Sequence, residues 1–478
     1  MDDLRRWLSG HGAHIDPRLV LVSREGGNHV EALSPISAGE TVARIAKTLV
    51  LSNRTSSLVV PPHLVDRLEH APPPLQLAVH VLHEMLCGST SEWAIYLATC
   101  PSPDMVSIAA LWPEDGEARR WSRGTQLEQE RKKLVIDEKT LARFFIDVAH
   151  AILSSGAPQS PSPTLASFRH AYILVSTRAF LVDAFHQLSL VPLADLFDHE
   201  QESAHNAHFA SDQWVCSECG RLDACEHDVE DDVHRRAERA LDERENTCDM
   251  VCNRPIAAAD EIFNHYGPGL SNAKLALHYG FSLEANEHDE VDFDSLTVSS
   301  AFGLSSEELE ELRARRELVL VDEKAVLLIE ADHPLLLPPE TPPAASDRLF
   351  IDADTRLSFA LWSLLALIAL PSDMDSTDIL PGLLSLTRVA RLWADAQDSE
   401  DDDLQLSEEE VVRLRRVGSL ITRLVGTTLE KQTEPSLSAV DLLDLAEHTS
   451  DASTRLAIEL LAGERLLLER LKQSWTLP

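Results

Sequence analysis

The sequence predicts an α+β chain: a strand-rich first part with a helical insertion, followed by an all-α C-terminal part. Between residues 19 and 51, alternating Val, Ile and Leu residues, with turns at Gly26-Gly27 and Ala38-Gly39, are typical of short strands. From residue 61 to 154 the apolar residues change to helical spacing, and after about residue 295 helical spacing dominates again. We therefore expect a first domain over 1–290, with a helical insertion over about 57–175, and a helical domain over 295–478.

Local patterns predict individual elements. Leu4, Trp7 and Leu8 indicate a short amphipathic helix over residues 1–12, and residues 165–188 return to helical spacing. Four leucines lie on one face of the last helix: Leu456, Leu460, Leu467 and Leu471. The acidic run from Asp398 to Glu410 is expected to be a solvated loop.

Composition restricts the class of partner. The chain has 42 Lys and Arg against 79 Asp and Glu, so its formal charge is 42 − 79 = −37. This charge argues against nucleic acid or an anionic membrane as a direct partner and favours a cationic one. Seven cysteines, with no signal peptide after Met1, predict a reducing compartment. The longest apolar run, 359–370, is too short to span a bilayer, so we expect a soluble intracellular protein.

The most informative stretch is residues 261–281, EIFNHYGPGLSNAKLALHYGF. Ile262 and Phe263 indicate a short strand, and Gly267-Pro268-Gly269 predicts a turn. Ser271 can then cap a short helix before Tyr279-Gly280-Phe281. Two Tyr-Gly pairs separated by Ser-Asn are more than a structural turn requires.

Together with residues 191–199, VPLADLFDH, this stretch resembles the SET-domain lysine methyltransferases. The branch it resembles includes the Rubisco large-subunit methyltransferase and the fungal ribosomal and elongation-factor lysine methyltransferases. Supporting segments occur in the same order at 36–52, 93–112 and 168–180, so the resemblance covers about residues 18–282.

The resemblance implies a β-rich SET domain with a knot-like C-terminal segment, followed by a helical domain that binds the protein substrate. It implies an S-adenosylmethionine-dependent protein-lysine N-methyltransferase of the cytoplasm, the nucleus or both. A non-histone protein with a basic segment, such as a ribosomal protein or translation factor, is the expected substrate.

The resemblance also assigns roles to residues. Tyr266 is the implied catalytic tyrosine, and Tyr279 and Phe281 are expected to shape the lysine channel and cover the donor. Gly280 is expected to allow close backbone approach. Arg178 aligns with an arginine that contacts the cofactor's carboxylate. The remaining implied cofactor residues are Gly27, Asn28, His29, Asp195, Leu196, Phe197, Asp198 and His199, the last five in the knot-like segment.

Two positions depart from the family pattern. Asp198 replaces an asparagine, so an amide that donates and accepts becomes an acceptor only. Gly27-Asn28-His29 carries a side chain where the family has the second glycine of Gly-x-Gly. A further channel aromatic has only Phe209 and Trp214 as candidates. These departures leave open a catalytically inactive binding module for a basic partner.

Other chemistries compete for some residues. His199, His205 and His208 do not have the HExxH spacing, so we expect no catalytic metal, although a zinc-dependent hydrolase remains a rival. A Cys- and acid-rich insertion over about 210–245 contains Cys216, Cys219, Cys225 and His227, which suit either a structural zinc site or plain reduced thiols. Cys248 and Cys252 are expected in the core. A protein-histidine methyltransferase is also open, because channel shape sets the acceptor.

Overall fold

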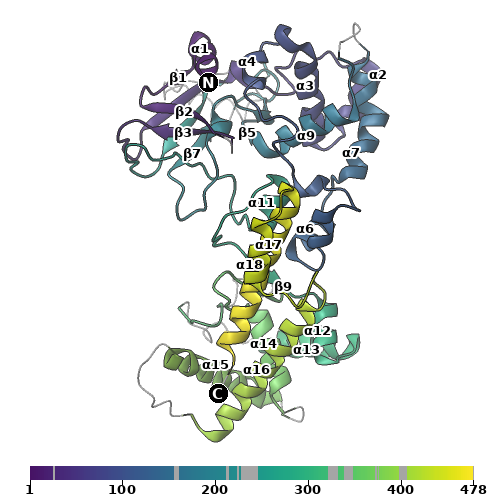
Figure 1. The fold of residues 1–478 in the computed structure, drawn as a ribbon, viewed down its shortest axis with the longest axis vertical. Helices are drawn as coiled ribbons and strands as arrows, with labels where there is room; N and C mark the ends of the chain where they lie inside the picture. The colour runs from purple at the N-terminus through teal and green to yellow at the C-terminus, as the bar shows by residue number, and fades with distance from the viewer. Residues whose placement is uncertain are drawn as a thin grey trace. The chain divides into compact units, whose positions relative to one another are not determined.

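The computed structural model describes residues 1–24, 27–155, 161–211, 215–222, 225–227, 246–320, 332–338, 348–371, 374, 376–397 and 406–476. The chain divides into two compact units, each built from several stretches of sequence (Figure 1). Unit 1 contains Met1–Leu111, Val135–Gly269 and His278–Gly280. Unit 2 contains Trp112–Leu134, Leu270–Leu277 and Phe281–Pro478. The predicted α+β class is confirmed, and helices make up most of the described part of unit 2.

The main sheet of unit 1 has four antiparallel strands in the order β1-β4-β8-β7. These strands are β1 (His14–Ile15), β4 (Thr41–Ala46), β8 (Thr247–Cys252) and β7 (Ala207–Ser211). Two antiparallel ribbons accompany the sheet: β2 (Leu19–Arg24) with β3 (Gly27–Ala32), and β5 (Ala179–Leu181) with β6 (Leu188–Leu190).

Strand β8 is a central strand of the sheet, and its residues alternate between buried and half-buried. Cys248, Met250 and Cys252 are buried, while the residues between them are half-buried. This period of two is that of a strand with one face in the core. The predicted core positions of Cys248 and Cys252 are therefore confirmed.

Helices form the rest of unit 1. They are α1 (Asp2–Gly10), α2 (Pro62–Glu69), α3 (Pro73–Cys87), α4 (Ala94–Leu97), α7 (Glu138–Phe144), α8 (His150–Leu153) and α9 (Leu165–Arg178), with the short 3₁₀ turns η1 (Lys47–Leu49), η2 (Gly88–Thr90) and η3 (Ala109–Leu111) and the π-helical segment η4 (Phe145–Ala149) between α7 and α8.

Helix α9 leads from this helical part toward the candidate active site. Thr164 and Ser167 form a capping box at its start, and the helix packs against α3. It ends at Arg178, where the chain passes directly into β5. The end of α9 therefore delivers Arg178 to the β5-β6 ribbon.

Unit 2 consists of helices and one short ribbon. The helices are α5 (Glu117–Trp121), α6 (Gln126–Lys132), α11 (Asn272–His278, whose last residue belongs to unit 1), α12 (Ser295–Phe302), α13 (Ser306–Leu320), α14 (Phe359–Ala369), α15 (Ser376–Gln397), α16 (Glu408–Leu429), α17 (Ala439–Glu447) and α18 (Ala452–Ser474). Strands β9 (Val291–Asp292) and β10 (Phe350–Ile351) pair antiparallel.

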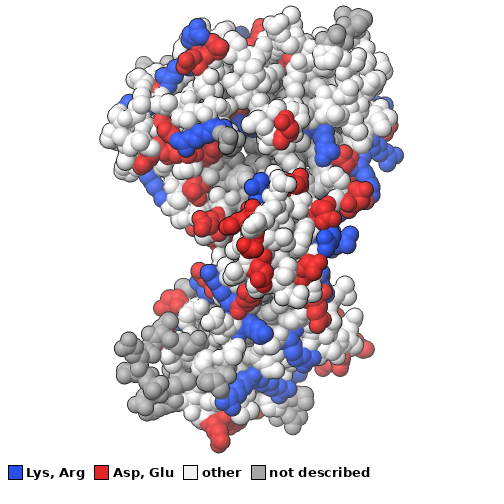
Figure 2. Space-filling view, in the orientation of Figure 1, with Lys and Arg blue, Asp and Glu red and all other residues white. Residues whose placement is uncertain are grey.

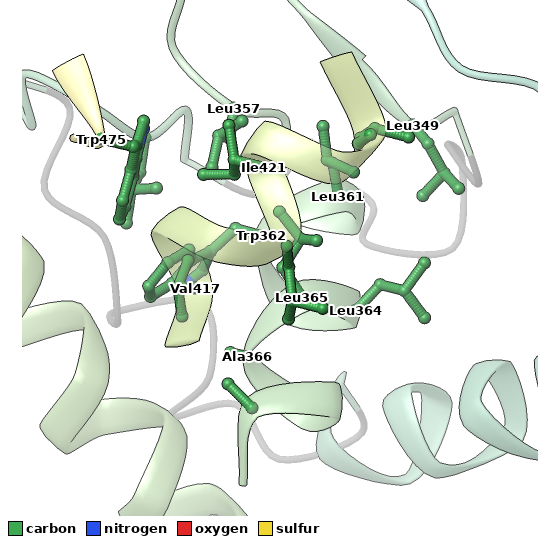
Figure 3. Close-up of a cluster of buried hydrophobic side chains, with 14 of the residues drawn as sticks. Leu349, Leu357, Leu361, Trp362, Leu364, Leu365, Ala366, Val417, Ile421 and Trp475 are labelled. Carbon is green, nitrogen blue, oxygen red and sulfur yellow. The ribbon is translucent and has the colours of Figure 1, made fainter. Parts of the chain in front are cut away.

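The core of unit 2 is apolar and is centred on α14 (Figure 3). Trp362 is buried there, its ring centroid 5.7 Å from that of Trp475, and its indole N–H donates to the Thr387 hydroxyl at 3.0 Å. Buried tryptophan usually finds such a partner. Because this core surrounds α14, the apolar run 359–370 is a core helix. Among the described residues, no helix is long and apolar enough to cross a membrane.

Three sequence predictions about local structure were wrong. The helix expected over residues 165–188 ends at Arg178, and residues 179–181 and 188–190 form the β5-β6 ribbon. Ile262 and Phe263 do not form a regular strand; only isolated bridges flank them, from Glu261 to Glu31 and from Asn264 to His199. The acidic run 398–410 is not simply a loop. Residues 398–405 lie outside the described residues, but the last three acids form the first turn of α16, capped by Ser407. Carboxylates are favourable there because they face the positive end of the helix dipole.

Candidate active site

The two signature segments lie side by side in unit 1. The short 3₁₀ turn η5 (Ala194–Leu196) precedes Asp198, whose carbonyl accepts from the Asn264 N–H at 2.8 Å. The Asn264 carbonyl in turn accepts from the Glu200 N–H at 3.0 Å, so His199 and Asn264 form a parallel bridge. Segments more than sixty residues apart in sequence are thus joined through their backbones, as the knot-like arrangement requires.

Tyr266 is held by both of its neighbours. Its backbone N–H donates to His199 Nδ1 at 3.1 Å, and the His199 and Tyr266 ring centroids are 5.0 Å apart. On its other side, the Tyr279 ring centroid lies 5.1 Å away. The predicted convergence of Tyr266, Tyr279 and the 195–199 segment is therefore present.

The Tyr266 hydroxyl keeps its proton. Burial raises the pKa of Tyr266 well above its usual value, and the nearby Asp198 carboxylate raises it further. Burial also raises the pKa of Tyr279. A phenol of this kind is a hydrogen-bonding group and not a general base near neutral pH.

Arg178 is engaged by the protein itself. Its Nη1 donates to the Asp195 carbonyl at 2.9 Å and lies 3.2 Å from Asp195 Oδ2, which also accepts from the Tyr96 hydroxyl at 2.9 Å. Burial raises the pKa of Asp195, and Arg178 and Tyr96 oppose that rise. Since a guanidinium does not lose its proton in proteins, we treat the pair as ionised.

Asp198 has a different environment. Its residue surface is exposed, yet surrounding protein atoms raise its pKa to about 6 by desolvation, with a contribution from Glu261. Asp198 is therefore largely ionised at neutral pH and becomes protonated below about pH 6.

The Gly27-Asn28-His29 segment starts β3, which contacts η5. Gly27 has a φ of +133°. The Asn28 amide donates to the Thr99 carbonyl at 2.9 Å, and the buried His29 ring lies 3.0 Å from the Glu31 carboxylate. The backbone thus borders the knot-like segment, while both side chains are used within the protein.

Gly280 meets the expectation of close approach. Its φ is +85°, and a Cβ atom added there would lie 2.3 Å from the Ser107 carbonyl oxygen. Nearby, the Ser176 hydroxyl donates to the His278 carbonyl at 2.9 Å. These contacts fix the backbone that carries Tyr279. Phe281, by contrast, belongs to unit 2.

The remaining predicted residues divide by burial. Leu196 and Phe197 are buried core residues, so only their backbone is available to a ligand. Phe209 stacks on Phe180 at a centroid distance of 4.5 Å, and Trp214 lies outside the described residues. Within the described chain, only Cys216, Cys219, Cys225 and His227 bring three or more candidate metal ligands together.

Sequence reasoning missed two site residues. Tyr96 belongs to a segment that supported the resemblance, but nothing in its pattern indicated a bond to Asp195, 99 positions away. Asn264 stands two residues before Tyr266, and its proximity to that tyrosine was the available signal.

Three buried polar atoms at this site have no hydrogen-bond partner among the described residues: Arg178 Nε, Asp195 Oδ1 and Asn264 Oδ1. Buried polar groups are usually satisfied, so such a group of atoms suits a polar ligand. One donor and two acceptors match a molecule that carries both an ammonium and a carboxylate group.

The known proteins that this chain is similar to include protein methyltransferases. No family model matches the chain. Ribosomal lysine N-methyltransferase 3 of Saccharomyces cerevisiae is 25% identical over 331 residues, which cover 56% of this chain and 58% of the relative. The human actin-histidine N-methyltransferase is 24% identical over 295 residues, covering 60% of this chain and 43% of the relative. The chain thus spans about half the length of these curated relatives.

Solved structures extend the similarity to the whole chain. The SET domain of LSMT bound to lysine and AdoHcy has a TM-score of 0.57 at 16% identity, covering 99% of this chain and 90% of that one. Rubisco LSMT bound to AdoMet has a TM-score of 0.56 at 15% identity, covering 99% and 91%. The chain therefore has the SET-domain fold of LSMT, and its resemblance to the SET-domain lysine methyltransferases is confirmed.

Proposed function

We propose that the chain is an S-adenosylmethionine-dependent protein-lysine N-methyltransferase. The observation that carries the proposal is the position of Tyr266, packed between His199 and Tyr279 and joined to the 195–199 segment. The similarity to a ribosomal lysine methyltransferase and the SET-domain fold support it.

S-adenosylmethionine supplies an electrophilic methyl group when it is bound. The unpartnered Arg178 Nε and Asn264 Oδ1 are the groups best suited to hold its charged and polar ends. The ionised Asp198 can accept from its ammonium group. Strand β3, which begins at Gly27, contacts η5, shortly before residues 198–199.

The contribution of Tyr266 is orientation. Its protonated hydroxyl can hydrogen-bond the acceptor amine without taking its proton, so the lysine must reach the site neutral. A desolvating channel favours the neutral amine because burial lowers the pKa of a lysine. Holding the methyl donor and the amine in line should lower the activation barrier by several kcal/mol, as alignment of two reactants does in other enzymes.

The central test separates binding from chemistry. Titration calorimetry with S-adenosylmethionine should give a binding signal for the wild-type chain and for Tyr266→Phe. Transfer of labelled methyl groups to a basic ribosomal-protein fraction should fall by roughly a hundredfold in Tyr266→Phe, which corresponds to about 2.7 kcal/mol.

Tyr172→Phe is a matched control because Tyr172 is another buried tyrosine of unit 1, on α9. It should retain transfer. Absence of any binding signal from the wild-type chain would instead support an inactive binding module. Full transfer by Tyr266→Phe would reject the role given to this phenol.

A histidine acceptor is the second candidate, because the actin-histidine methyltransferases match 60% of this chain. Acid hydrolysis of the labelled product distinguishes the two, since methyl-lysine and methyl-histidine separate by chromatography. Methyl-lysine is the product we expect. If methyl-histidine were the only product, the protein would be a histidine methyltransferase and the lysine proposal would be rejected.

We also propose that the protein substrate presents a basic segment. Unit 2 contains a cavity of about 620 Å³ whose lining includes Glu284, Asp289, Glu290, Glu447, Glu459 and Glu464. Figure 2 shows acidic side chains gathered over α17 and α18, the helices that contribute to this cavity. Such a surface attracts cationic partners and raises their rate of association.

Charge removal at this cavity tests the partner. Glu284 and Glu447 are exposed, so Glu284→Gln combined with Glu447→Gln should leave the fold unchanged. The KM for a basic protein substrate should rise severalfold while kcat stays constant, with weaker dependence on salt. The exposed Glu92, in unit 1, offers Glu92→Gln as a control. An unchanged KM in the double variant would reject this docking site.

A ribosomal protein or translation factor as substrate, and a cytoplasmic or nuclear location, are further parts of the proposal. None of the seven cysteines, all of which lie in the described part of the chain, forms a disulfide, which suits a reducing compartment. Mass spectrometry of a deletion strain, searching for lost methyl groups on basic proteins, would identify the substrate. Microscopy of a fluorescent fusion would test the location.

A further inference from the structure

A group of four metal-ligating side chains follows strand β7 in unit 1, outside the candidate active site. The ligating atoms of Cys216, Cys219, Cys225 and His227 all lie within 4.8 Å of one another. Cys225 Sγ is 3.8 Å from His227 Nδ1. None of these four residues was needed to build the site around Tyr266, so the convergence calls for its own explanation.

The first two cysteines sit in a tight backbone turn. The Gly220 N–H donates to the Cys216 carbonyl at 2.8 Å, and the Cys216 N–H donates to the Arg221 carbonyl at 2.9 Å. Gly220 has a φ of +69°, a conformation that L side chains rarely adopt. The turn formed by the Cys-x-x-Cys-Gly sequence therefore holds the two sulfur atoms close enough to bind the same metal ion.

The turn is attached to the body of unit 1. A Cβ added to Gly220 would lie 2.9 Å from Phe185 Cδ1, so the glycine backbone packs directly on that ring. The Asn246 amide donates to the Gly220 carbonyl at 3.2 Å, and Cys216 is 2% exposed. This anchoring distinguishes the turn from a solvated loop that happens to contain thiols.

We propose that Cys216, Cys219, Cys225 and His227 bind a structural zinc ion. Three thiolates and one imidazole are a standard tetrahedral zinc set, and soft sulfur ligands disfavour calcium and magnesium. With Zn–S bonds of about 2.3 Å, ligand atoms in a tetrahedron are about 3.8 Å apart. The observed separations therefore need to contract by no more than about 1 Å.

The ligand set also fixes the role of the ion. Four protein ligands complete a tetrahedron, so no coordination position stays open for a substrate or an activated water. The proposed zinc stabilises the turn that follows β7, the strand whose residues 207–211 pair with residues 248–252 of β8. It does not take part in methyl transfer, and the proposal does not depend on the function proposed above.

The opposite end of β7 is bonded to the segment that leads to Tyr266. Asn206, directly before β7, accepts from the Phe263 N–H at 2.8 Å and donates to the Glu261 carbonyl at 3.0 Å. Those residues precede Tyr266 on the same segment. A zinc ion beyond one end of β7 would thus help to hold a strand whose opposite end positions the candidate active site.

The metal content of the full-length chain, purified without chelator, tests the proposal. Elemental mass spectrometry should find about one zinc per chain, the content expected of one four-ligand site. Cobalt(II) added to the metal-free, reduced chain should give the intense visible bands of a tetrahedral thiolate complex. Cys225→Ser combined with His227→Ala should abolish both signals.

That double variant alters only half-buried and exposed ligands, so it should fold with the circular dichroism of the wild type. Cys87→Ser, which changes a half-buried cysteine outside the group, should keep the zinc. Hydrogen exchange over residues 207–211 should become faster in the zinc-free chain. This readout remains informative even if a variant of the buried Cys216 fails to fold.

Three results would overturn the proposal. The reduced wild-type chain could contain no zinc and take up none from a small excess of Zn²⁺. The Cys225 and His227 double variant could retain the wild-type amount. Peptide mass spectrometry could find a disulfide between any two of Cys216, Cys219 and Cys225 in protein that was prepared under reducing conditions.

Discussion

Two buried carboxylates, Asp195 of unit 1 and Glu464 of unit 2, have different hydrogen-bond partners. In unit 1, Asp195 lies 3.2 Å from the Arg178 guanidinium and accepts from the Tyr96 hydroxyl. In unit 2, Glu464 accepts from the Gln126 N–H and the Gln432 amide, both at 2.8 Å. Burial raises the pKa of Glu464 to about 7, because the two neutral hydrogen-bond donors offset only part of the desolvation of the carboxylate.

The two carboxylates differ in how they respond to the loss of a partner and to the binding of a proton. The ion pair of unit 1 fixes the side chains of Arg178, Asp195 and Tyr96 beside Tyr266. Removing one charged partner leaves the other charge unpaired inside the protein, which is strongly destabilising. The acid of unit 2 can bind a proton at little cost to its surroundings. Unit 1 should therefore be sensitive to small changes near its site, while unit 2 should respond mainly to pH.

The largest expected effect is that of Asp195→Ala. The change leaves the buried Arg178 charge without its partner, so unit 1 should lose about 3–5 kcal/mol of unfolding free energy. Tyr96→Phe, which removes one hydrogen bond and keeps the ion pair, should cost about 1 kcal/mol. Native-state hydrogen exchange, followed separately in peptides of each unit, measures both. Equal losses for the two variants would remove the contrast between the units.

Glu464→Gln should change the pH dependence of unit 2. The pKa of Glu464 is raised from 4.5 to about 7, so its contribution to stability is fully present below about pH 4.5 and is lost as pH rises through 7. Relative to the variant, the wild type should therefore lose about 3 kcal/mol over this interval. Denaturation at a series of pH values checks this. Parallel curves for the two proteins would show that Glu464 is not the titrating group.

Gly280→Ala should be harmful where a comparable change in unit 2 is harmless. The new Cβ would meet the Ser107 carbonyl oxygen at 2.3 Å with φ at +85°, so we expect a loss of at least about 1–2 kcal/mol and displacement of Tyr279. Gly426, inside α16, has nothing within 4 Å of an added Cβ. Gly426→Ala should stabilise by about 0.5–1 kcal/mol, because alanine favours helix interiors.

Thermal melts and the fluorescence of bound cofactor analogues would record the two glycine variants. Gly269→Ala serves as the control for backbone strain alone, since Gly269 has a φ of +65° and nothing within 4 Å of an added Cβ. If Gly280→Ala and Gly269→Ala behaved alike, the contact with Ser107 would have no separate effect.

The smallest expected effect concerns Asp198, a carboxyl group of unit 1 that no side chain pairs with at short range in the described structure. Its pKa is raised from 3.8 to about 6, so it gains a proton as pH falls through 6. The affinity for S-adenosylmethionine should then fall by roughly two- to tenfold between about pH 7 and pH 5, as expected when one exposed charge contact is lost. Asp198→Asn should show no such dependence in calorimetry. A dependence shared by both proteins would assign the titration to another group.

Much of unit 1 could be predicted from its motifs. The convergence of Tyr266 with residues 195–199 and the close approach at Gly280 followed from short segments whose order along the chain is distinctive. The partner of Arg178 could not be predicted, because the sequence gives no register between the end of α9 and the 195–199 segment. Tyr96 was missed for the same reason: its bond to Asp195 depends on the packing of α3, α4 and α9.

The errors have local causes. Ile262 and Phe263 have the composition of a strand, but their segment bonds to three different neighbours, β3, residues 198–200 and residues 206–207, and forms no continuous ladder with any of them. Glu408 to Glu410 look like part of a solvated run, but Ser407 turns them into a capped first helical turn. A cap is a short signal within a long acidic stretch, so charge density concealed it.

The interleaved composition of the units has a consequence for biosynthesis. The Gln126 N–H of unit 2 bonds to Glu464, 338 residues later in the chain. At about 5–20 residues per second, a ribosome needs roughly 20–70 s to make the second partner after the first. Residues 112–134 must therefore wait, exposed or chaperoned, until the last helix emerges, and no single cut in the gene would release either unit whole.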